Sequence, residues 1–92
     1  MARNFRVFAK AINKQTMALQ LFGDFDATSA CELIDILDDV VKKNDKIAID
    51  TNGLKTVNGF GLDVFIPRMN RLNSKWPEIM VTGRYCDIFT DA

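Results

Sequence analysis

The sequence contains no histidine, which removes the usual general base of enzymes and the commonest metal ligand. It has only two cysteines, Cys31 and Cys86, and their wide separation excludes a Cys-x-x-Cys zinc or redox site. No metal-ligand set and no serine or cysteine beside a base can be assembled from the remaining residues. The sequence therefore predicts a protein that is not an enzyme and that uses no cofactor.

A basic surplus is also missing, because twelve lysines and arginines balance twelve aspartates and glutamates. Proteins that bind nucleic acid through its phosphates normally carry such a surplus, so we expect no nucleic-acid partner. No apolar run is long enough to span a bilayer, and Met1–Arg6 is not followed by the apolar segment of a signal peptide. We expect a cytoplasmic chain without direct membrane insertion, with both cysteines reduced and one of them in the core.

The chain is an ordinary globular sequence in size and composition. It has 92 residues, of which 48% are apolar and 26% are charged. This length is typical of one domain, so residues 1–92 are predicted to form a single unit.

Alternating apolar and polar residues predict four strands. The polar stretch Asn13–Gln15 separates the first two strands and is typical of an antiparallel hairpin. Gly23 is expected to end the second strand and Gly83 the fourth, and residues 52–61 are expected to form a loop. The predicted strands span residues 5–12, 16–22, 46–51 and 78–82.

Apolar residues at helical spacing, from Ala30 to Val41, predict an amphipathic helix. Ser29 and Glu32 have the spacing of a capping box, and Asp26 is an equally good cap for this helix. Lys42 and Lys43 are expected in its last turn, where cations suit the helix dipole.

A second helical pattern runs from Leu62 to Leu72 and contains Pro67, which predicts either a kink or a new start there. Residues 73–77 are expected to form a turn that includes Trp76, and residues 85–90 a last short helical turn.

The predicted order is β-β-α-β-α-β, an α/β fold with a four-stranded mixed sheet. Successive right-handed crossovers place both main helices on one face of the sheet, with a short or missing helical part at the C-terminus. The face toward the helices is expected to be wholly apolar and the other face half solvated. The second face mixes polar residues with Phe8, Ile12, Phe22 and Met80.

This order, with the segments Leu21–Asp26 and Ile49–Leu54, resembles the STAS domain, a family that includes the bacterial anti-sigma factor antagonists. The resemblance runs from about Phe5 to Gly83. In the family, one strand ends in Gly-x-Leu-Asp, a later one ends in Asp-Leu-Ser-Gly-Val, and the second helix opens with Asp-Ser-Ser-Gly-Leu. The matching residues here are Gly23, Phe25, Asp26, Asp50, Gly53, Leu54, Gly61 and Leu62.

The departures from the family pattern fall in the loop that opens the second helix. Asn58 replaces the aspartate, Gly59 stands where the family has its phosphorylated serine, and Phe60 replaces the next hydroxyl residue. The resemblance therefore implies a module that no kinase can phosphorylate at Gly59. Only nine residues follow Gly83, where relatives usually continue through further helices and a strand. Phosphorylation at a displaced hydroxyl stays open as an alternative. The first candidate is Thr56, and the others are Thr51, Thr28 and Ser29.

In relatives this loop and the start of the following helix face an anti-sigma factor or another serine-kinase-like ATPase. Phe60 and Val64 lie four residues apart and off the core stripe, so we expect their side chains to be exposed. The resemblance and this exposure together predict a partner-binding surface. The predicted contact residues are Asn58, Gly59, Phe60, Gly61, Leu62 and Val64.

Other interpretations of these residues stay open. The loop is also compatible with a plain turn in which Asn58 caps the helix, the glycines adopt unusual backbone angles and Phe60 folds back onto the sheet edge. Gly59 and Gly61 together offer an anion cradle, although no lysine follows them as in a P-loop.

Three further predictions concern partners and metals. The resemblance allows an accessory subunit that binds the ATPase of an ABC-type transporter of lipids or anions. The half-apolar sheet face allows a homodimer. Asp24 and Asp26 are spaced like a metal-binding pair, but two carboxylates are too few for calcium or magnesium, so a turn and a helix cap are expected.

Overall fold

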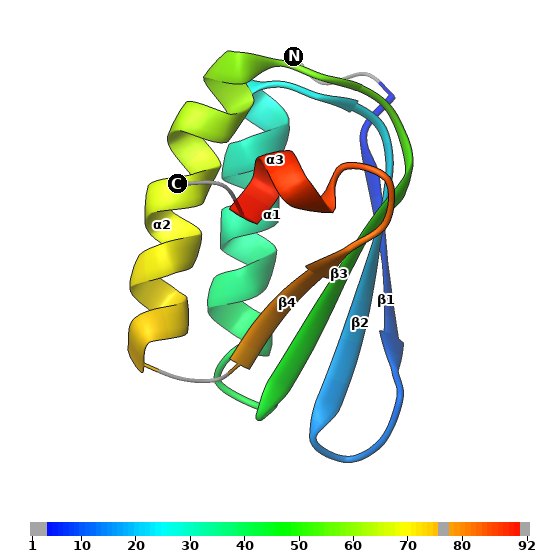
Figure 1. Cartoon of the computed structure of the whole chain (residues 1–92). Helices are drawn as coiled ribbons and strands as arrows, with labels where there is room; N and C mark the ends of the chain where they lie inside the picture. The colour runs from blue at the N-terminus through cyan, green and yellow to red at the C-terminus, as the bar shows by residue number, and fades with distance from the viewer. Residues whose placement is uncertain (1–3, 76–77, 91–92) are drawn as a thin grey trace.

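The computed structural model describes residues 4–75 and 78–90, and the elements follow the predicted order (Figure 1). Residues 76 and 77 of the predicted turn fall outside these ranges, and the prediction is wrong for residues 73–75, which belong to the helix Gly59–Lys75. The elements are β1 (Arg6–Ala11), β2 (Thr16–Phe25), α1 (Ala27–Val40), β3 (Lys46–Val57), α2 (Gly59–Lys75), β4 (Glu78–Thr82) and α3 (Cys86–Thr90).

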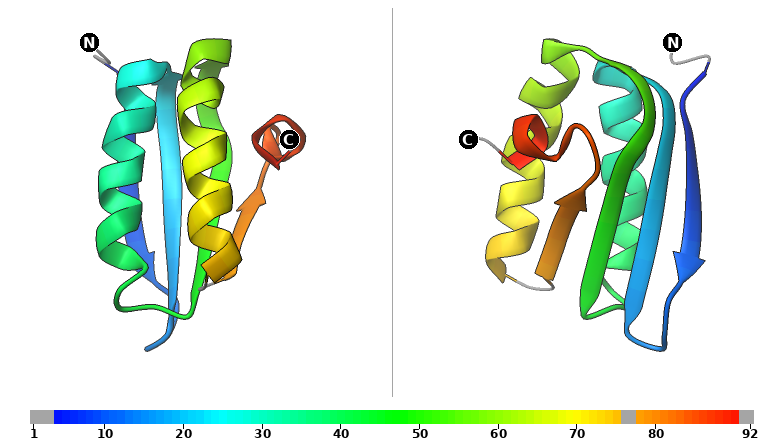
Figure 2. Two further views of the ribbon diagram at one scale, coloured as in Figure 1. Left: turned by 90° about the vertical axis from the view of Figure 1, so that its left-hand side faces the viewer. Right: turned by 45° about the vertical axis from the view of Figure 1, so that its right-hand side comes forward.

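The four strands form one mixed sheet in the order β1-β2-β3-β4. β1 is antiparallel to β2, whereas β2, β3 and β4 are parallel to one another and are joined through α1 and α2. Figure 2 shows α1 and α2 side by side on one face of the sheet. The predicted fold class is therefore confirmed. None of the helices within the described ranges is long and apolar enough to cross a membrane.

The core lies between the sheet and the helices, where the predicted apolar face is buried. At the end where α2 begins, the core is a cluster of phenylalanine rings around Phe25. Its ring centroid lies 5.8 Å from that of Phe65, 4.9 Å from that of Phe89 and 5.9 Å from that of Phe5. Phe89 belongs to α3, so this five-residue helix is held by one wholly buried ring.

The two central strands are longer than predicted. β2 continues through Gly23 to Phe25, and β3 continues through Gly53 to Val57, so both the predicted end at Gly23 and the predicted loop before Asn58 are wrong. The two strands stay paired across register shifts on either side of Gly23. A Cβ at Gly23, whose φ is +91°, would collide with the backbone of Asn4. Long-range pairing at these glycines outweighs their local tendency to form turns.

The helix ends differ in part from the prediction. Asp26 caps α1, and α1 ends at Val40, so Lys42 and Lys43 lie in the following turn instead of the last helical turn. The Asn44 side chain closes this end by donating a hydrogen bond to the Val40 carbonyl oxygen at 3.0 Å. α2 does not restart at Pro67 but runs through it as one helix.

Neither cysteine is in the core, which corrects the prediction that one would be. Cys31 is exposed on α1 and Cys86 is half-buried at the start of α3, and they are not joined in a disulfide.

Candidate functional site

The starts of α1 and α2 lie together at one edge of the sheet. α1 follows β2 and α2 follows β3, and because these strands are parallel neighbours, both helices begin at the same end (Figure 1). The backbone amide of Asn58 donates a hydrogen bond of 2.8 Å to the carbonyl oxygen of Phe25, and this bond joins the two strand ends. The topology thus brings the end of the segment Leu21–Asp26 and the start of α2, which holds the matching residues Gly61 and Leu62, to one surface.

Asn58 is the cap of α2. Its side-chain oxygen accepts a hydrogen bond of 2.8 Å from the Phe60 amide, and its carbonyl oxygen accepts from the Gly61 amide at 3.0 Å. These bonds satisfy amides that have no partner within the helix. The start of α2 is therefore fixed by a neutral side chain.

Gly59 and Gly61 have different surroundings. A Cβ at Gly61 would lie 2.8 Å from the carbonyl oxygen of Asp26, so this glycine allows α2 to pass close to the start of α1. A Cβ at Gly59 would meet no atom of the packed structure within 4 Å. Neither glycine has a positive φ, so the predicted unusual backbone angles are wrong for both.

The Phe60 side chain projects away from the core and is 73% exposed, which agrees with the predicted exposure and not with folding onto the sheet edge. Leu62 and Val64 are half-buried and pack against the core, so Val64 is less exposed than expected. We call residues 58–64 the docking turn. Its exposed residues are Asn58, Gly59, Phe60 and Asp63, and Gly59 and Phe60 form the centre of its outward side.

Asp26 and Ser29 form the cap of α1. The Asp26 carboxylate accepts hydrogen bonds from the Ser29 amide at 2.8 Å and from the Ser29 hydroxyl at 3.0 Å. The bond from the Ser29 amide, which favours the charged form, lowers the pKa of Asp26 below its usual 3.8. Ser29 therefore contributes to the cap as a donor, not as the capping residue.

Asp24 links the chain's N-terminal segment to β3. Its carboxylate accepts a hydrogen bond of 2.8 Å from the Thr56 hydroxyl and another of 3.3 Å from the Asn4 amide group. Asp26 is thus the predicted cap, whereas Asp24 lies within β2 and not in the predicted turn. Across residues 4–75 and 78–90, no three acidic or cysteine side chains gather as a metal site would require.

Among the hydroxyls near this edge, Ser29 and Thr51 are buried. Thr51 donates a hydrogen bond of 2.7 Å to the Thr82 carbonyl oxygen and accepts one of 3.1 Å from the Tyr85 amide. Thr51 therefore connects β3 to the segment before α3. No local sequence pattern around Thr51 indicated this structural role. Thr28 and Thr56 are exposed.

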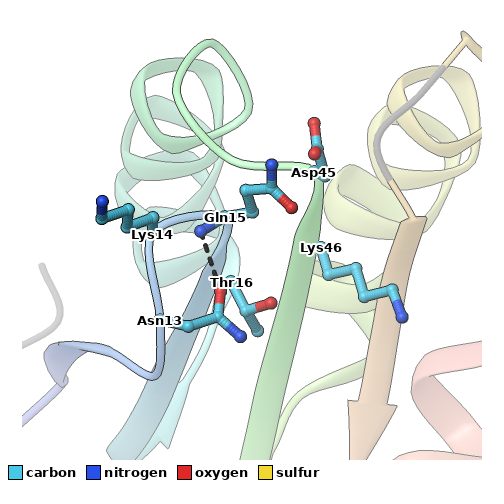
Figure 3. A pocket seen from close by; sticks show the side chains of 6 residues that line it. All are labelled: Asn13, Lys14, Gln15, Thr16, Asp45 and Lys46. Atoms are coloured by element: carbon cyan, nitrogen blue, oxygen red, sulfur yellow. Dashed lines mark hydrogen bonds between the residues drawn. The ribbon is translucent and has the colours of Figure 1, made fainter.

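A shallow pocket lies at the opposite end of the sheet, by the β1–β2 hairpin and the start of β3 (Figure 3). The backbone amide of Gln15 donates a hydrogen bond of 2.8 Å to the side-chain oxygen of Asn13 there. This pocket is remote from the docking turn, and its charged side chains are Lys14, Asp45 and Lys46.

No family model and no curated protein matches the sequence. Solved structures do match. An anti-sigma factor antagonist from Mycobacterium paratuberculosis is 17% identical, with a TM-score of 0.70 over 87% of this chain and 68% of that one. The anti-sigma factor antagonist SpoIIAA in its unphosphorylated form is 14% identical, with a TM-score of 0.64 over 83% of this chain and 71% of that one. Mglu is 16% identical, with a TM-score of 0.71 over 80% of this chain but only 18% of its own.

These likenesses establish the fold. The chain has the STAS-like fold of the anti-sigma factor antagonists, as the order of its elements and its two motif segments predicted.

Proposed function

We propose that residues 1–92 form a single, non-enzymatic protein-binding module that acts in the cytoplasm as an anti-sigma factor antagonist. Its partner is an anti-sigma factor of the serine-kinase-like ATPase class. The shared fold supports the kind of role. The observation that carries the proposed site is the 73% exposed ring of Phe60 in the first turn of α2.

The docking turn has the physical properties of a binding site. Asn58 fixes its start, and Gly61 holds it against α1, so it is ordered before any partner arrives. An exposed aromatic ring on an ordered turn loses little conformational freedom on binding, which favours affinity. Phe60 is therefore the proposed anchor, with Leu62 and Val64 as flanking contacts.

The module is proposed to remain in one binding state. Gly59 has no hydroxyl, so a phosphate that would add about −1.5 to −2 charges cannot be attached there. Thr56 is a poor substitute, because its hydroxyl already donates to the Asp24 carboxylate and a phosphate would lie beside that charge. Binding is then controlled by the amount of the protein and not by phosphorylation of the docking turn.

The test is an affinity capture from lysate of the source organism, with the captured proteins identified, followed by titration of the purified partner. We compare the wild type with Phe60→Asp and with Ile12→Asp, a matched change at a 58% exposed side chain in the distant hairpin. A carboxylate at the second position of a helix suits the helix dipole, so Phe60→Asp should fold. We expect Phe60→Asp to weaken binding at least about tenfold and Ile12→Asp to leave it unchanged.

Gly59 offers a second test of the same surface. Gly59→Asp places a negative charge at the centre of the outward side, in space that is open. We expect Gly59→Asp to lose the partner and Gly59→Ala to retain it.

Capture of no kinase-like ATPase, or equal capture by the wild type and Phe60→Asp, would contradict the proposal. Capture of a transporter ATPase that Phe60→Asp abolishes would keep the docking turn and overturn the role in transcription.

A further inference from the structure

The face of the sheet opposite the helices has an apolar patch that crosses all four strands. In the described part of the chain no helix covers this face (Figure 2). Phe8 is 55% exposed and Met80 is 49% exposed, although both belong to strands. The Phe8 ring contacts the Phe22 ring edge-on, with centroids 5.3 Å apart. The apolar residues of this face, which we call the back patch, are Phe8, Ala18, Phe22, Ala48 and Met80, and the polar pair Gln20 and Asp50 lies among them.

The charges around the back patch are distributed unevenly across the strands. β1 presents two cations on this face, Arg6 and Lys10. At the residues whose register is given, β3 presents Asp50 and Lys46 on this face and β4 presents Glu78, which lies beside Lys46. Among these residues, β1 therefore contributes two positive charges, whereas β3 and β4 together have two carboxylates and one lysine, a small negative excess.

We propose that the back patch binds a second copy of this chain, face to face, about a two-fold axis that runs along the strands. Such an axis places β1 of one copy over β4 of the other, and β2 over β3. Lys10 then lies opposite Met80 of the second copy, and Glu78 is the next residue of β4 on the same face. The positive charges of β1 in each copy meet the side of the other copy that has the small negative excess, while the apolar side chains meet one another.

A two-fold axis at right angles to the strands gives the contrary result. It places β1 over β1, so that Arg6 and Lys10 of both copies share one strip of the interface. Like charges brought together in this way are unfavourable. The charge pattern therefore selects the first arrangement.

The size of the face sets the strength of the contact. The four strands are spaced by about 4.8 Å, and each has three or four residues that point to this face. Together they cover on the order of 400 Å² of projected area per copy. Stable complexes bury about 800 Å² of accessible surface per partner, so we expect a weak, reversible dimer that forms at high concentration.

The test is sedimentation velocity of the purified chain over a wide concentration range, up to about millimolar, where weak interfaces of this kind associate. We expect the wild type to dimerise and Met80→Ser and Phe8→Ser to reduce association at least about tenfold. Phe60→Ser, which removes an even more exposed ring from the docking turn, should dimerise like the wild type. A wild type that stays monomeric throughout, or association that Phe60→Ser alone abolishes, would overturn the proposal.

A charge exchange tests the orientation of the two copies. Lys10→Glu and Glu78→Lys should each weaken self-association, and a mixture of the two variants should associate more strongly than either alone. Lys42→Glu, in the exposed turn after α1, is the control and should have no effect. Stronger association of Lys10→Glu alone would show β1 over β1 and overturn the proposed arrangement. These measurements need no partner protein, so their outcome is independent of the proposed binding to an ATPase.

Discussion

The inward and outward sides of the first turns of α2 have similar residues and opposite roles. Gly61 and Phe65 face inward, where the glycine meets the backbone of Asp26 and the ring is wholly buried. Gly59 and Phe60 face outward, where the glycine meets nothing and the ring is 73% exposed. Packing therefore determines the residue types on one side only. The outward pair contributes little to the fold and is free to serve binding.

The largest expected difference is between the two phenylalanines. Phe65→Ala removes a ring that contacts Phe25 and Phe89, and should lower the free energy of unfolding by about 3–5 kcal/mol. Phe60→Ala should change it by less than about 0.5 kcal/mol, because the ring is already in solvent. Urea unfolding followed by circular dichroism measures both. Similar losses for the two variants would break the contrast between the two sides.

The two glycines should differ next. Gly61→Ala forces a Cβ against the Asp26 carbonyl oxygen and should destabilise the protein by about 1–3 kcal/mol. Gly59→Ala fills open space and restricts the unfolded chain, so it should be neutral or stabilising by up to about 1 kcal/mol. Thermal unfolding of both variants checks this. A Gly59→Ala protein as unstable as Gly61→Ala would show that the outward side is also constrained by packing.

The smallest expected effect depends on pH. The pKa of Asp26 is lower in the folded state than its usual 3.8, so the charged cap stabilises the protein above that value. The stabilisation is lost as the pH falls through the lower folded-state pKa. Asp26→Asn keeps a good cap but cannot ionise. Because Asp26 is partly exposed to solvent, the substitution should lower the free energy of unfolding by no more than about 0.3–1 kcal/mol at neutral pH.

The free energies of unfolding of the wild type and Asp26→Asn should converge as the pH is lowered below the folded-state pKa. A difference that stays constant over the acidic range would mean that the charge of Asp26 does not contribute. Wild type measured at each pH serves as the reference for global acid effects.

Much of the fold followed from local patterns. The alternation in β1 and in the first half of β2 identified the buried face, and the helical spacing of Leu62, Phe65 and Met69 placed Phe60 outside the core. The cap at Asn58 was also predictable, since asparagine before a helix commonly accepts a hydrogen bond from the first turn.

The remaining features depend on contacts between distant residues. Glycines at 23 and 53 are local turn signals, yet both lie within strands because the neighbouring strand pairs across them. Phe89 lies in a C-terminal segment with no marked pattern, and it is buried because its ring packs against those of Phe25 and Phe65.

The amino-acid sequence by itself determined the order of the elements, the two faces of the sheet and the lack of a hydroxyl at Gly59, because these depend on residue type and on spacing along the chain. Only the tertiary structure decided where β2 and β3 end, why Gly61 must be glycine while Gly59 need not be, and which apolar side chains remain uncovered. These properties depend on atoms from segments far apart in the chain, and no local pattern contains that information.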